Sequence, residues 1–272
     1  MQELTKDIIK AHFKTREASS HKGSHGHALI IAGSMGRMGA AVITARACLR
    51  SGTGLLTVNV PTDERFILQT AIPEAMLIIR DNEQHDLSIF SAAGVGPGMG
   101  TDIDSKKMLT SILNNFKQPL LLDADALNMI ATDKELLKKL PVGTILTPHP
   151  KEFDKLFGSH NTIEERISTA IQKAKDYQIV IVLKGHETVV TGAGESYINN
   201  TGNAGLAKGG SGDALTGIIT AFLAQGYQPL TAAIQGVYIH GLAADLALEK
   251  QSMESMLITD VIECIGVAFK QI

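Results

Sequence analysis

The stretch at residues 202–213 carries the residue types most suited to chemistry in this chain. It reads Gly-Asn-Ala-Gly-Leu-Ala-Lys-Gly-Gly-Ser-Gly-Asp, and an apolar run with helical spacing follows it directly. Glycine lets a backbone approach a ligand closely. The free N–H groups and the positive dipole end at the start of a helix favour a bound anion. The sequence therefore predicts a loop that binds a phosphate at a helix N-terminus.

Asp213, the last residue of this stretch, is unexpected beside a phosphate because a carboxylate repels one. Its side chain could cap the following helix, as aspartate often does. It could instead take a proton from a substrate, or help to place a metal ion. The loop alone leaves these interpretations open.

Other polar or glycine-rich clusters each follow a predicted strand. Nearly continuous apolar strands that alternate with helices predict a mostly parallel sheet covered on both faces. Ligands bind at the carboxyl ends of such strands. We therefore expect the clusters to converge on one crevice, closed by residues 202–213. The clusters lie at residues 33–40, 94–100, 123–128, 147–152 and 184–188.

The remaining patterns agree with one α/β domain over residues 1–272, because no linker or internal repeat divides the chain. Thr162 and Glu165 have capping-box spacing at the start of a predicted helix over 162–177. A hairpin is predicted within 187–199. Three further helices are predicted near 213–225, 229–248 and 259–270.

Composition excludes several classes of function. The formal net charge is −3, which does not favour a nucleic-acid partner. No apolar run is long enough to span a bilayer, so no membrane association is expected. The first residues lack the apolar centre of a signal peptide. The two cysteines, Cys48 and Cys264, lie in apolar helical patterns and are expected as buried free thiols. A cytoplasmic protein is the expectation.

Four motifs stand out along the chain: Thr147-Pro-His-Pro-Lys-Glu152, Asp123-Ala-Asp-Ala-Leu-Asn128, Val95-Gly-Pro-Gly-Met-Gly100 and the 202–213 loop. Together they resemble the ADP/ATP-dependent NAD(P)H-hydrate dehydratases, a family of ribokinase-like proteins, over residues 25–270. The resemblance implies a three-layer α/β/α ribokinase-like fold with a central, mostly parallel sheet and no separate lid domain. Many relatives carry an added N-terminal epimerase domain, for which the 272 residues leave no room. This chain is therefore expected to be the stand-alone form and to act with a separate NAD(P)H-hydrate epimerase.

The resemblance implies a chemical role for Asp213. The family removes water from the S-epimer of NADH or NADPH hydrate and consumes ADP or ATP. Asp213 would take the proton of the 6-hydroxyl while its oxygen attacks the terminal phosphate, and phosphate would then depart. Mg²⁺ would neutralise the nucleotide phosphates. A homo-oligomer, a tetramer in relatives, is also implied.

The match assigns further residues to substrate, nucleotide or metal. Glu152 is expected at the magnesium ion, and His149 replaces the asparagine that ribokinase-like kinases carry in this motif. Asp123, Asp125 and Asn128 are expected to hold substrate ribose or phosphate, or else to cap the following helix. The expected substrate contacts are Ala40, Gly98, His149 and Asp213. The expected nucleotide contacts are Lys184, Gly185, His186, Glu187, Thr188, Asn203, Gly209, Gly210, Ser211 and Gly212.

Two other functions compete with this interpretation. One is a ribokinase-like small-molecule kinase that acts on a vitamin-precursor alcohol. The other is a non-catalytic nucleotide sensor, which would gain nothing from the Asp213 carboxylate. His186 and His240 are also compatible with hydrogen-bonded structural histidines.

Overall fold

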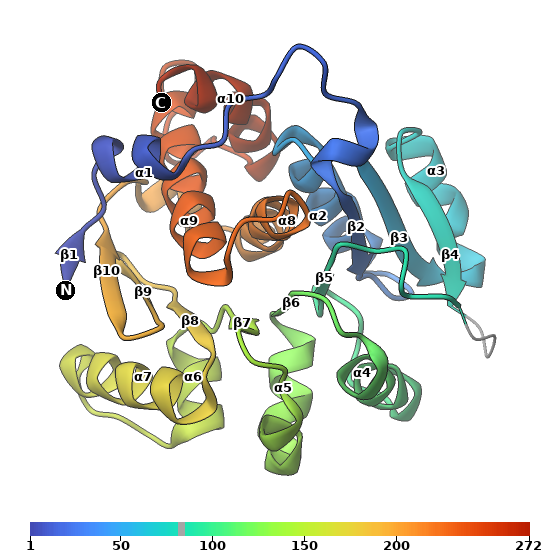
Figure 1. Cartoon of the computed structure of the whole chain (residues 1–272), viewed down its shortest axis with the longest axis horizontal. Helices are drawn as coiled ribbons and strands as arrows, with labels where there is room; N and C mark the ends of the chain where they lie inside the picture. Colours follow the sequence, from blue (N-terminus) through green and yellow to red (C-terminus); the bar gives the residue numbers. More distant parts are fainter. Residues whose placement is uncertain (81–84) are drawn as a thin grey trace.

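Ten strands form one sheet in the computed structural model, which describes residues 1–80 and 85–272 (Figure 1). From β8 to β4 every neighbouring pair is parallel, and β9 is antiparallel to both of its neighbours. The sheet order is β1-β10-β9-β8-β7-β6-β5-β2-β3-β4. The strands are β1 Gln2–Glu3, β2 His27–Ile31, β3 Leu55–Pro61, β4 Met76–Arg80, β5 Ala92–Val95, β6 Leu120–Leu122, β7 Ile145–Leu146, β8 Val180–Leu183, β9 Thr188–Gly192 and β10 Glu195–Asn199.

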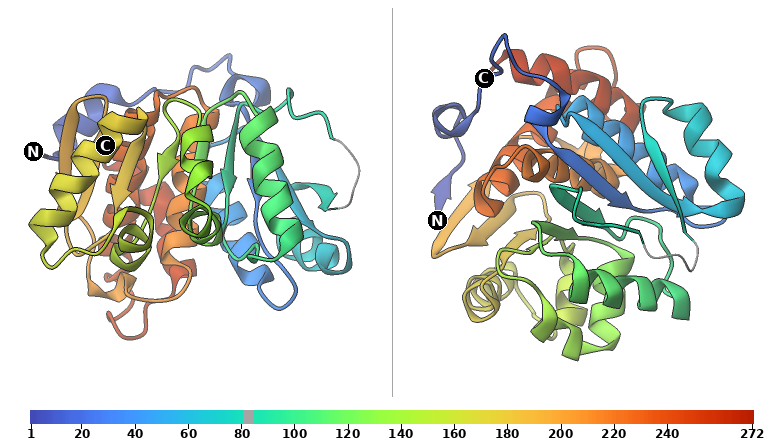
Figure 2. Two further views of the ribbon diagram at one scale, coloured as in Figure 1. Left: turned by 90° about the horizontal axis from the view of Figure 1, so that it is seen from below. Right: turned by 45° about the vertical axis from the view of Figure 1, so that its right-hand side comes forward.

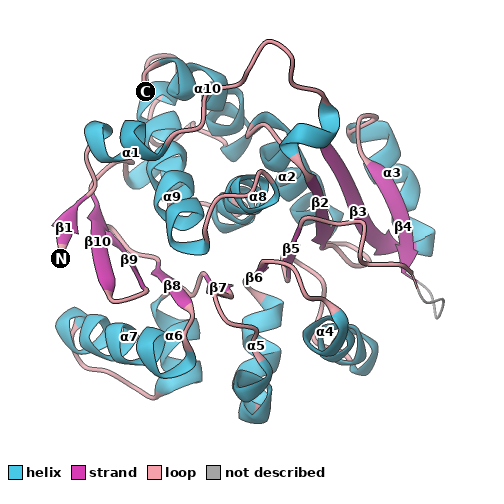
Figure 3. Ribbon diagram, viewed as in Figure 1, coloured by secondary structure: helices cyan, strands magenta, loops and turns pink. Residues whose placement is uncertain are grey.

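Helices cover both faces of the sheet, which confirms the expected three-layer α/β/α architecture (Figures 1 and 3). The two further views show the same layers (Figure 2). One face carries α1 Lys6–His12, α2 Met38–Arg50, α3 Arg65–Ala71, α8 Ser211–Ala224, α9 Pro229–Ala247 and α10 Ile258–Lys270. The other carries α4 Ile103–Asn115, α5 Asp125–Thr132, α6 Pro150–Phe157 and α7 Ile163–Tyr177.

The strands divide their side chains between two hydrophobic cores. Along β2, Ala28 and Ile30 belong to the core beneath α2, α8, α9 and α10. The alternate residues Leu29 and Ile31 belong to the core beneath α4 to α7. Side chains alternate across a strand, so a strand that is buried on both faces must be apolar throughout. This explains the continuous apolar runs in the sequence.

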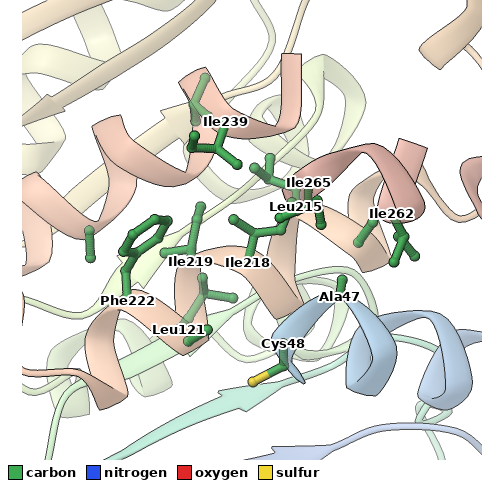
Figure 4. Packing of buried hydrophobic residues seen from close by; sticks show 14 of the residues in the cluster. Ala47, Cys48, Leu121, Leu215, Ile218, Ile219, Phe222, Ile239, Ile262 and Ile265 are labelled. Carbon is green, nitrogen blue, oxygen red and sulfur yellow. The ribbon is translucent and has the colours of Figure 1, made fainter. Parts of the chain in front are cut away.

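Helix α8 lies in the middle of the first core, and every residue from Ala214 to Ala224 is buried (Figure 4). Small residues let its neighbours approach closely. A Cβ on Gly217 would come 2.2 Å from the carbonyl oxygen of Thr44 in α2. A Cβ on Gly236 in α9 would come 2.4 Å from Cγ1 of Ile219. Tight packing on two sides therefore fixes the position of the N-terminus of α8.

Most predicted elements are present, although several short ones were not anticipated. The Thr162 hydroxyl accepts from the Glu165 N–H at 3.2 Å, as the capping-box spacing predicted. The strand β1 and the helices α3 and α6 were not predicted, and α5 was expected only as a helix that the DADALN motif could cap. Each has eight residues or fewer, which is too short for a clear periodic pattern. Both cysteines are free, with Cys48 buried and Cys264 half-buried. No helix among the described residues is long and apolar enough to cross a membrane.

Candidate active site

Backbone hydrogen bonds link the loops that follow neighbouring parallel strands, so the polar clusters lie along one edge of the sheet. The Gly33 N–H, just after β2, donates to the carbonyl of Pro97 at 2.8 Å. The Asp123 N–H, just after β6, donates to the carbonyl of Val95, the last residue of β5, at 3.0 Å. The Lys184 N–H, just after β8, donates to the carbonyl of Pro148 at 2.9 Å. The sheet topology thus brings together the clusters that the sequence singled out.

The glycine-rich loop enters α8 with its N-terminal N–H groups available to a ligand. Gly210 is the N-cap residue, with a φ of 94° and no side chain to accept a hydrogen bond. The Ala214 N–H donates to the Gly210 carbonyl at 2.9 Å. Within the described residues, the N–H groups of Gly212 and Asp213 have no protein acceptor. This is the arrangement that the phosphate-binding prediction requires.

Asp213 is the third residue of α8 and does not cap it, so the N-cap interpretation is wrong. The carboxylate is half-buried, and its pKa is raised from 3.8 to about 6. Burial is the main cause. The negative charges of Asp123 and Asp125 add to it, while the nearby Lys184 ammonium opposes it. A carboxylate with a pKa of about 6 is a stronger base than a free aspartate and is still mostly ionised at neutral pH.

Lys184, whose side chain is 20% exposed, and the buried Asp123 form an ion pair beside the N-terminal turn of α8. Lys184 Nζ lies 2.9 Å from Asp123 Oδ1, and the Thr216 hydroxyl donates to Asp123 Oδ2 at 2.9 Å. A Cβ on Gly212 would lie 3.2 Å from Lys184 Nζ. The absence of a side chain at Gly212 therefore lets the ammonium lie close to the first turn of the helix.

The charges around Lys184 favour its protonated form. Burial alone would lower the pKa of the ammonium, but the carboxylates of Asp123, Glu152 and Asp213 raise it above its ordinary value. His240 of α9 is 7% exposed, and its pKa is lowered to about 4 by burial and by the Lys184 charge. Its buried Nε2 has no hydrogen-bond partner within the described residues, so the interpretation of His240 as a hydrogen-bonded structural histidine is not supported at that atom.

Ala40 and Gly98, two predicted substrate contacts, come together where α2 begins. A Cβ on Gly98, whose φ is 59°, would lie 2.9 Å from the Cβ of Ala40. The Ser34 hydroxyl donates to the Gly98 carbonyl at 2.8 Å. Only glycine satisfies both the positive φ and this close approach. The structure therefore joins the turns after β2 and β5 into one surface.

Asp125 contacts residues of the same surface, whereas Asn128 has Lys155 of α6 as its partner. Asp125 accepts from the Gly100 N–H at 2.9 Å and lies 3.6 Å from the Arg37 guanidinium. Neither predicted cap is present, because α5 begins without a side-chain capping bond. Asn128 accepts from Lys155 Nζ at 3.0 Å in an exposed position.

His149 and Glu152 form a capping box at the start of α6. His149 Nδ1 accepts from the N–H groups of Lys151 and Glu152 at 3.1 and 3.3 Å. In return, the His149 N–H donates to Glu152 Oε2 at 2.9 Å. Pro150 occupies the first turn, where its lack of an N–H costs nothing. The Glu152 side chain is buried and the His149 side chain is half exposed.

The strip from Lys184 to Thr188 joins β8 to β9 and exposes its middle. Gly185, His186 and Glu187 are exposed. The Thr188 hydroxyl accepts from the Gly185 N–H at 3.4 Å, which closes the turn. The strip is thus open to a ligand beside the Lys184 ammonium.

Asp245 of α9 anchors the start of the glycine-rich loop. Asp245 Oδ2 accepts from the Gly202 N–H at 2.9 Å, and Oδ1 accepts from Asn203 Nδ2 at 3.1 Å. The Asn203 Oδ1 atom accepts from the Gly205 N–H at 3.0 Å. Lys208 then holds the middle of the loop through the carbonyls of Glu254 and Met256. Gly209, Gly210 and Ser211 follow as the half-exposed or exposed entry to α8.

Sequence reasoning missed two residues of this arrangement and left a third undecided. Thr216 follows Asp213 by one helical turn, a spacing that could have revealed a shared face. Asp245 is 32 or more positions from the loop that it anchors, and no local pattern marks it. The sequence left Asp123 between a substrate contact and a helix cap, and the structure places it in an ion pair with Lys184.

Among the described residues, the candidate site offers single carboxylates rather than a preformed metal-binding cluster. The described residues contain no group of three or more histidine, cysteine or carboxylate side chains that could bind a metal alone. Mg²⁺ commonly uses one or two carboxylates together with substrate phosphates and water. Glu152, a buried carboxylate near Lys184, fits such a role.

A cavity of about 830 Å³ lies elsewhere, between α4 and the β2–β4 part of the sheet. Arg80 and Met108 are among its lining residues, and none of the predicted site residues lines it. The candidate site is therefore defined by chemistry at the strand ends rather than by the size of this cavity.

The fold and this site define a ribokinase-like protein. A ribokinase-like superfamily protein from Enterococcus faecalis has a TM-score of 0.90 and 29% identity, with 99% of this chain and 95% of that one covered. An ADP/ATP-dependent NAD(P)H-hydrate dehydratase from Bacillus subtilis, crystallised with ATP and Mg²⁺, has a TM-score of 0.89 and 32% identity over 99% of this chain and 98% of that one.

Sequence comparison identifies the family. A family model described as NAD(P)H-hydrate dehydratase matches residues 28–266. An ADP-dependent (S)-NAD(P)H-hydrate dehydratase from Neisseria meningitidis is 37% identical, with 90% of this chain and 85% of that protein covered. The chain belongs to the NAD(P)H-hydrate dehydratase family. It spans about half the length of the bifunctional NAD(P)H-hydrate repair enzymes from Moorella thermoacetica and Escherichia coli, at 52% and 51%.

Proposed function

We propose that this protein catalyses the ADP- or ATP-dependent dehydration of the S-epimer of NADH or NADPH hydrate, which restores NADH or NADPH. The observation that carries the proposal is the position of Asp213. Its carboxylate, with a pKa of about 6, lies in the same helical turn as two N–H groups that have no protein acceptor within the described residues. The proposed general base and the proposed phosphate site therefore lie in the same turn of α8.

Asp213 would accept the proton of the substrate hydroxyl as the hydroxyl oxygen attacks the terminal phosphorus of the nucleotide. The bond between that phosphorus and the bridging oxygen breaks, which leaves AMP from ADP or ADP from ATP. The carbon–oxygen bond then breaks, and inorganic phosphate leaves with the former hydroxyl oxygen. The electron pair of the ring nitrogen expels the phosphate and forms a carbon–nitrogen double bond. Loss of a proton from the neighbouring ring carbon C5 then moves the double bond to C5–C6 and restores the reduced ring.

The chain's own residues would stabilise the phosphate as its charge changes. The Gly212 and Asp213 N–H groups are fixed by α8 and need no reorganisation during the reaction. Lys184 adds a positive charge beside that turn. Bound Mg²⁺ would reduce the negative charge of the nucleotide phosphates, and Glu152 is its proposed protein ligand.

The other predicted residues are proposed around this centre. Ala40, Gly98 and His149 would contact the substrate, with His149 near the nicotinamide end. Asp125 would hold the turn at Gly100 through their 2.9 Å hydrogen bond. Residues 185–188 would contact the nucleotide beside Lys184. Residues 1–272 as one domain, a cytoplasmic location, a homotetramer and a separate epimerase partner are further proposals.

The test follows the labelled oxygen of the hydroxyl. NADH hydrate carrying ¹⁸O at the 6-hydroxyl is incubated with protein, MgCl₂ and ADP or ATP, and absorbance of the reduced ring is recorded. We expect recovery of NADH with one ¹⁸O in each inorganic phosphate released. A small-molecule kinase would instead give a stable phosphorylated alcohol. Absence of NADH recovery with both nucleotides, from folded protein, refutes the proposal.

Asp213→Asn separates catalysis from binding. Asparagine has nearly the same shape but cannot accept the proton, so we expect nucleotide affinity to persist while turnover falls by about 10²–10⁴-fold. A nucleotide sensor without catalysis would show no turnover in either protein. Turnover of Asp213→Asn near the wild-type rate would show that Asp213 is not the base.

A further inference from the structure

Asp123 is a carboxylate that the proposed reaction does not use directly, although it lies at the centre of the site. It follows β6, and the residue is 1% exposed. Oδ1 lies 2.9 Å from Lys184 Nζ, and Oδ2 accepts from the Thr216 hydroxyl at 2.9 Å. A buried charge is stable only when it is paired and hydrogen-bonded. Both oxygens therefore have a protein partner, and burial keeps the carboxylate from direct contact with a substrate.

Lys184 needs a partner to keep its ammonium in one place. A lysine side chain is flexible, and the loss of rotamer entropy opposes its fixation. Thr216 and Asp213 lie one turn apart on α8, so a carboxylate bonded to Thr216 is held in register with the N-terminus of that helix. The ion pair with Asp123 thereby fixes the Lys184 ammonium beside the backbone of Gly212.

Several charged groups face this ion pair from different elements. Glu152 of α6 and Asp213 of α8 act on Lys184 in addition to Asp123. His240 of α9 also faces Lys184, and its low pKa keeps it neutral. Of these groups, Asp123 is the one joined to Lys184 by a hydrogen bond.

We propose that Asp123 is a positioning residue that, together with Thr216, holds the Lys184 ammonium at the N-terminal turn of α8, where the transferred phosphoryl group would lie. This inference rests on the proposed function for the identity of that group. A cation that is already in position stabilises developing charge without reorganisation during the reaction. Without the ion pair, Lys184 would still bind a nucleotide phosphate, but its ammonium would not be fixed where negative charge develops in the transition state.

Asp123→Asn tests the proposal because it removes the charge and keeps the shape. We expect kcat to fall by about tenfold or more, while the affinity for ADP with Mg²⁺, measured by calorimetry, stays equal or becomes tighter. Binding does not weaken because the variant removes a negative charge near an anion site. The acid limb of the pH–rate profile should also move to lower pH, since Asp213 loses a negative neighbour.

Thr216 provides a matched pair of variants. Thr216→Val keeps the volume but removes the hydroxyl donor, and we expect kcat to fall by about three- to tenfold with the acid limb unmoved. Thr216→Ser retains a hydroxyl and should restore most of this loss. A purely structural role for Thr216 would lower kcat and thermal stability together and would not depend on the hydroxyl.

A binding cycle tests the positioning role without turnover, and so separates it from the proposed reaction. Lys184→Met should weaken ADP binding more in the Asp123→Asn background than in the wild-type background. In the Asp123→Asn protein, Lys184 has lost its anionic partner, so its ammonium contributes more to phosphate binding. An equal loss in both backgrounds overturns the proposal. So does an unchanged kcat in Asp123→Asn, or an ADP affinity that falls tenfold in that variant. If the wild type repairs no NADH hydrate, the cycle still decides the role of Asp123.

Discussion

Asp213→Asn should make the ligand-free protein more stable while it removes catalysis. In the folded protein the ionised Asp213 carboxylate is disfavoured by burial and by the charges of Asp123 and Asp125. In the unfolded chain water solvates the same carboxylate freely. Asparagine keeps the shape and removes the charge, so the variant escapes this penalty.

The magnitude follows from the difference between the two pKa values. A carboxyl pKa raised from 3.8 to about 6 on folding corresponds to about 3 kcal/mol when the group is fully ionised in both states. Asp213 is only half-buried, so solvent reduces the effect, and we expect a gain of about 1–3 kcal/mol at pH 8. For a chain of this size the Tm should rise by about 2–8 °C.

The sign of the pH dependence is fixed by the direction of the shift. Above pH 6 the folded protein carries the disfavoured charge, and the stabilisation by Asp213→Asn is complete. As pH falls from 6 toward 3.8, the folded carboxyl takes up its proton before the unfolded one does. The difference in free energy of unfolding between variant and wild type should therefore shrink through this range and vanish below pH 3.8, where the carboxyl is protonated in both states.

Urea unfolding at several pH values, followed by circular dichroism, measures this difference. Asp102→Ala is a control of opposite sign, because Asp102 caps α4 and its pKa is lowered by hydrogen bonds, first of all from the Ser105 N–H. That variant should lose about 1 kcal/mol. An Asp213→Asn variant no more stable than wild type at pH 8, or a gain that does not depend on pH, refutes the reasoning.

Three further predictions concern the base, the packing and the loop. The value of kcat/KM should rise with pH and level off with an apparent pKa of about 6, because only ionised Asp213 accepts a proton. A rate profile from pH 5 to 8 measures this dependence, and a profile that is flat across this range contradicts it. Gly217→Ala should lower the free energy of unfolding by about 1–3 kcal/mol because its Cβ would lie 2.2 Å from the Thr44 carbonyl oxygen. Its control, Gly266→Ala, has no neighbour within 4 Å and should stabilise α10 by about 0.5–1 kcal/mol in the same urea titration. Asp245→Ala frees the Gly202 N–H and Asn203 Nδ2, so ADP affinity measured by calorimetry should fall by about tenfold, and an unchanged affinity would show that the anchor is not needed.

The amino-acid sequence by itself determined the layers and the position of the phosphate loop. A strand that is buried on both faces must be apolar at every position, as β8 Val180–Leu183 is. The carboxyl ends of parallel strands must also lie at one edge of the sheet. The glycines of the 202–213 loop and the apolar residues after Asp213 likewise specify a loop that enters a helix. These patterns are local in the sequence. The strands and helices that they indicate are present in the fold because the backbone periods of strand and helix set the spacing of the buried residues.

Only the tertiary structure decided how the charged residues are arranged around that loop. The Lys184–Asp123 pair joins residues 61 positions apart, and the Thr216–Asp123 bond joins residues 93 positions apart. The burial that raises the pKa of Asp213 also depends on every element packed around α8. Sequence periodicity reports which face of an element is buried but not which side chains meet across the sheet. Side-chain pairing, and with it the acidity of each group, is therefore a property of the folded chain.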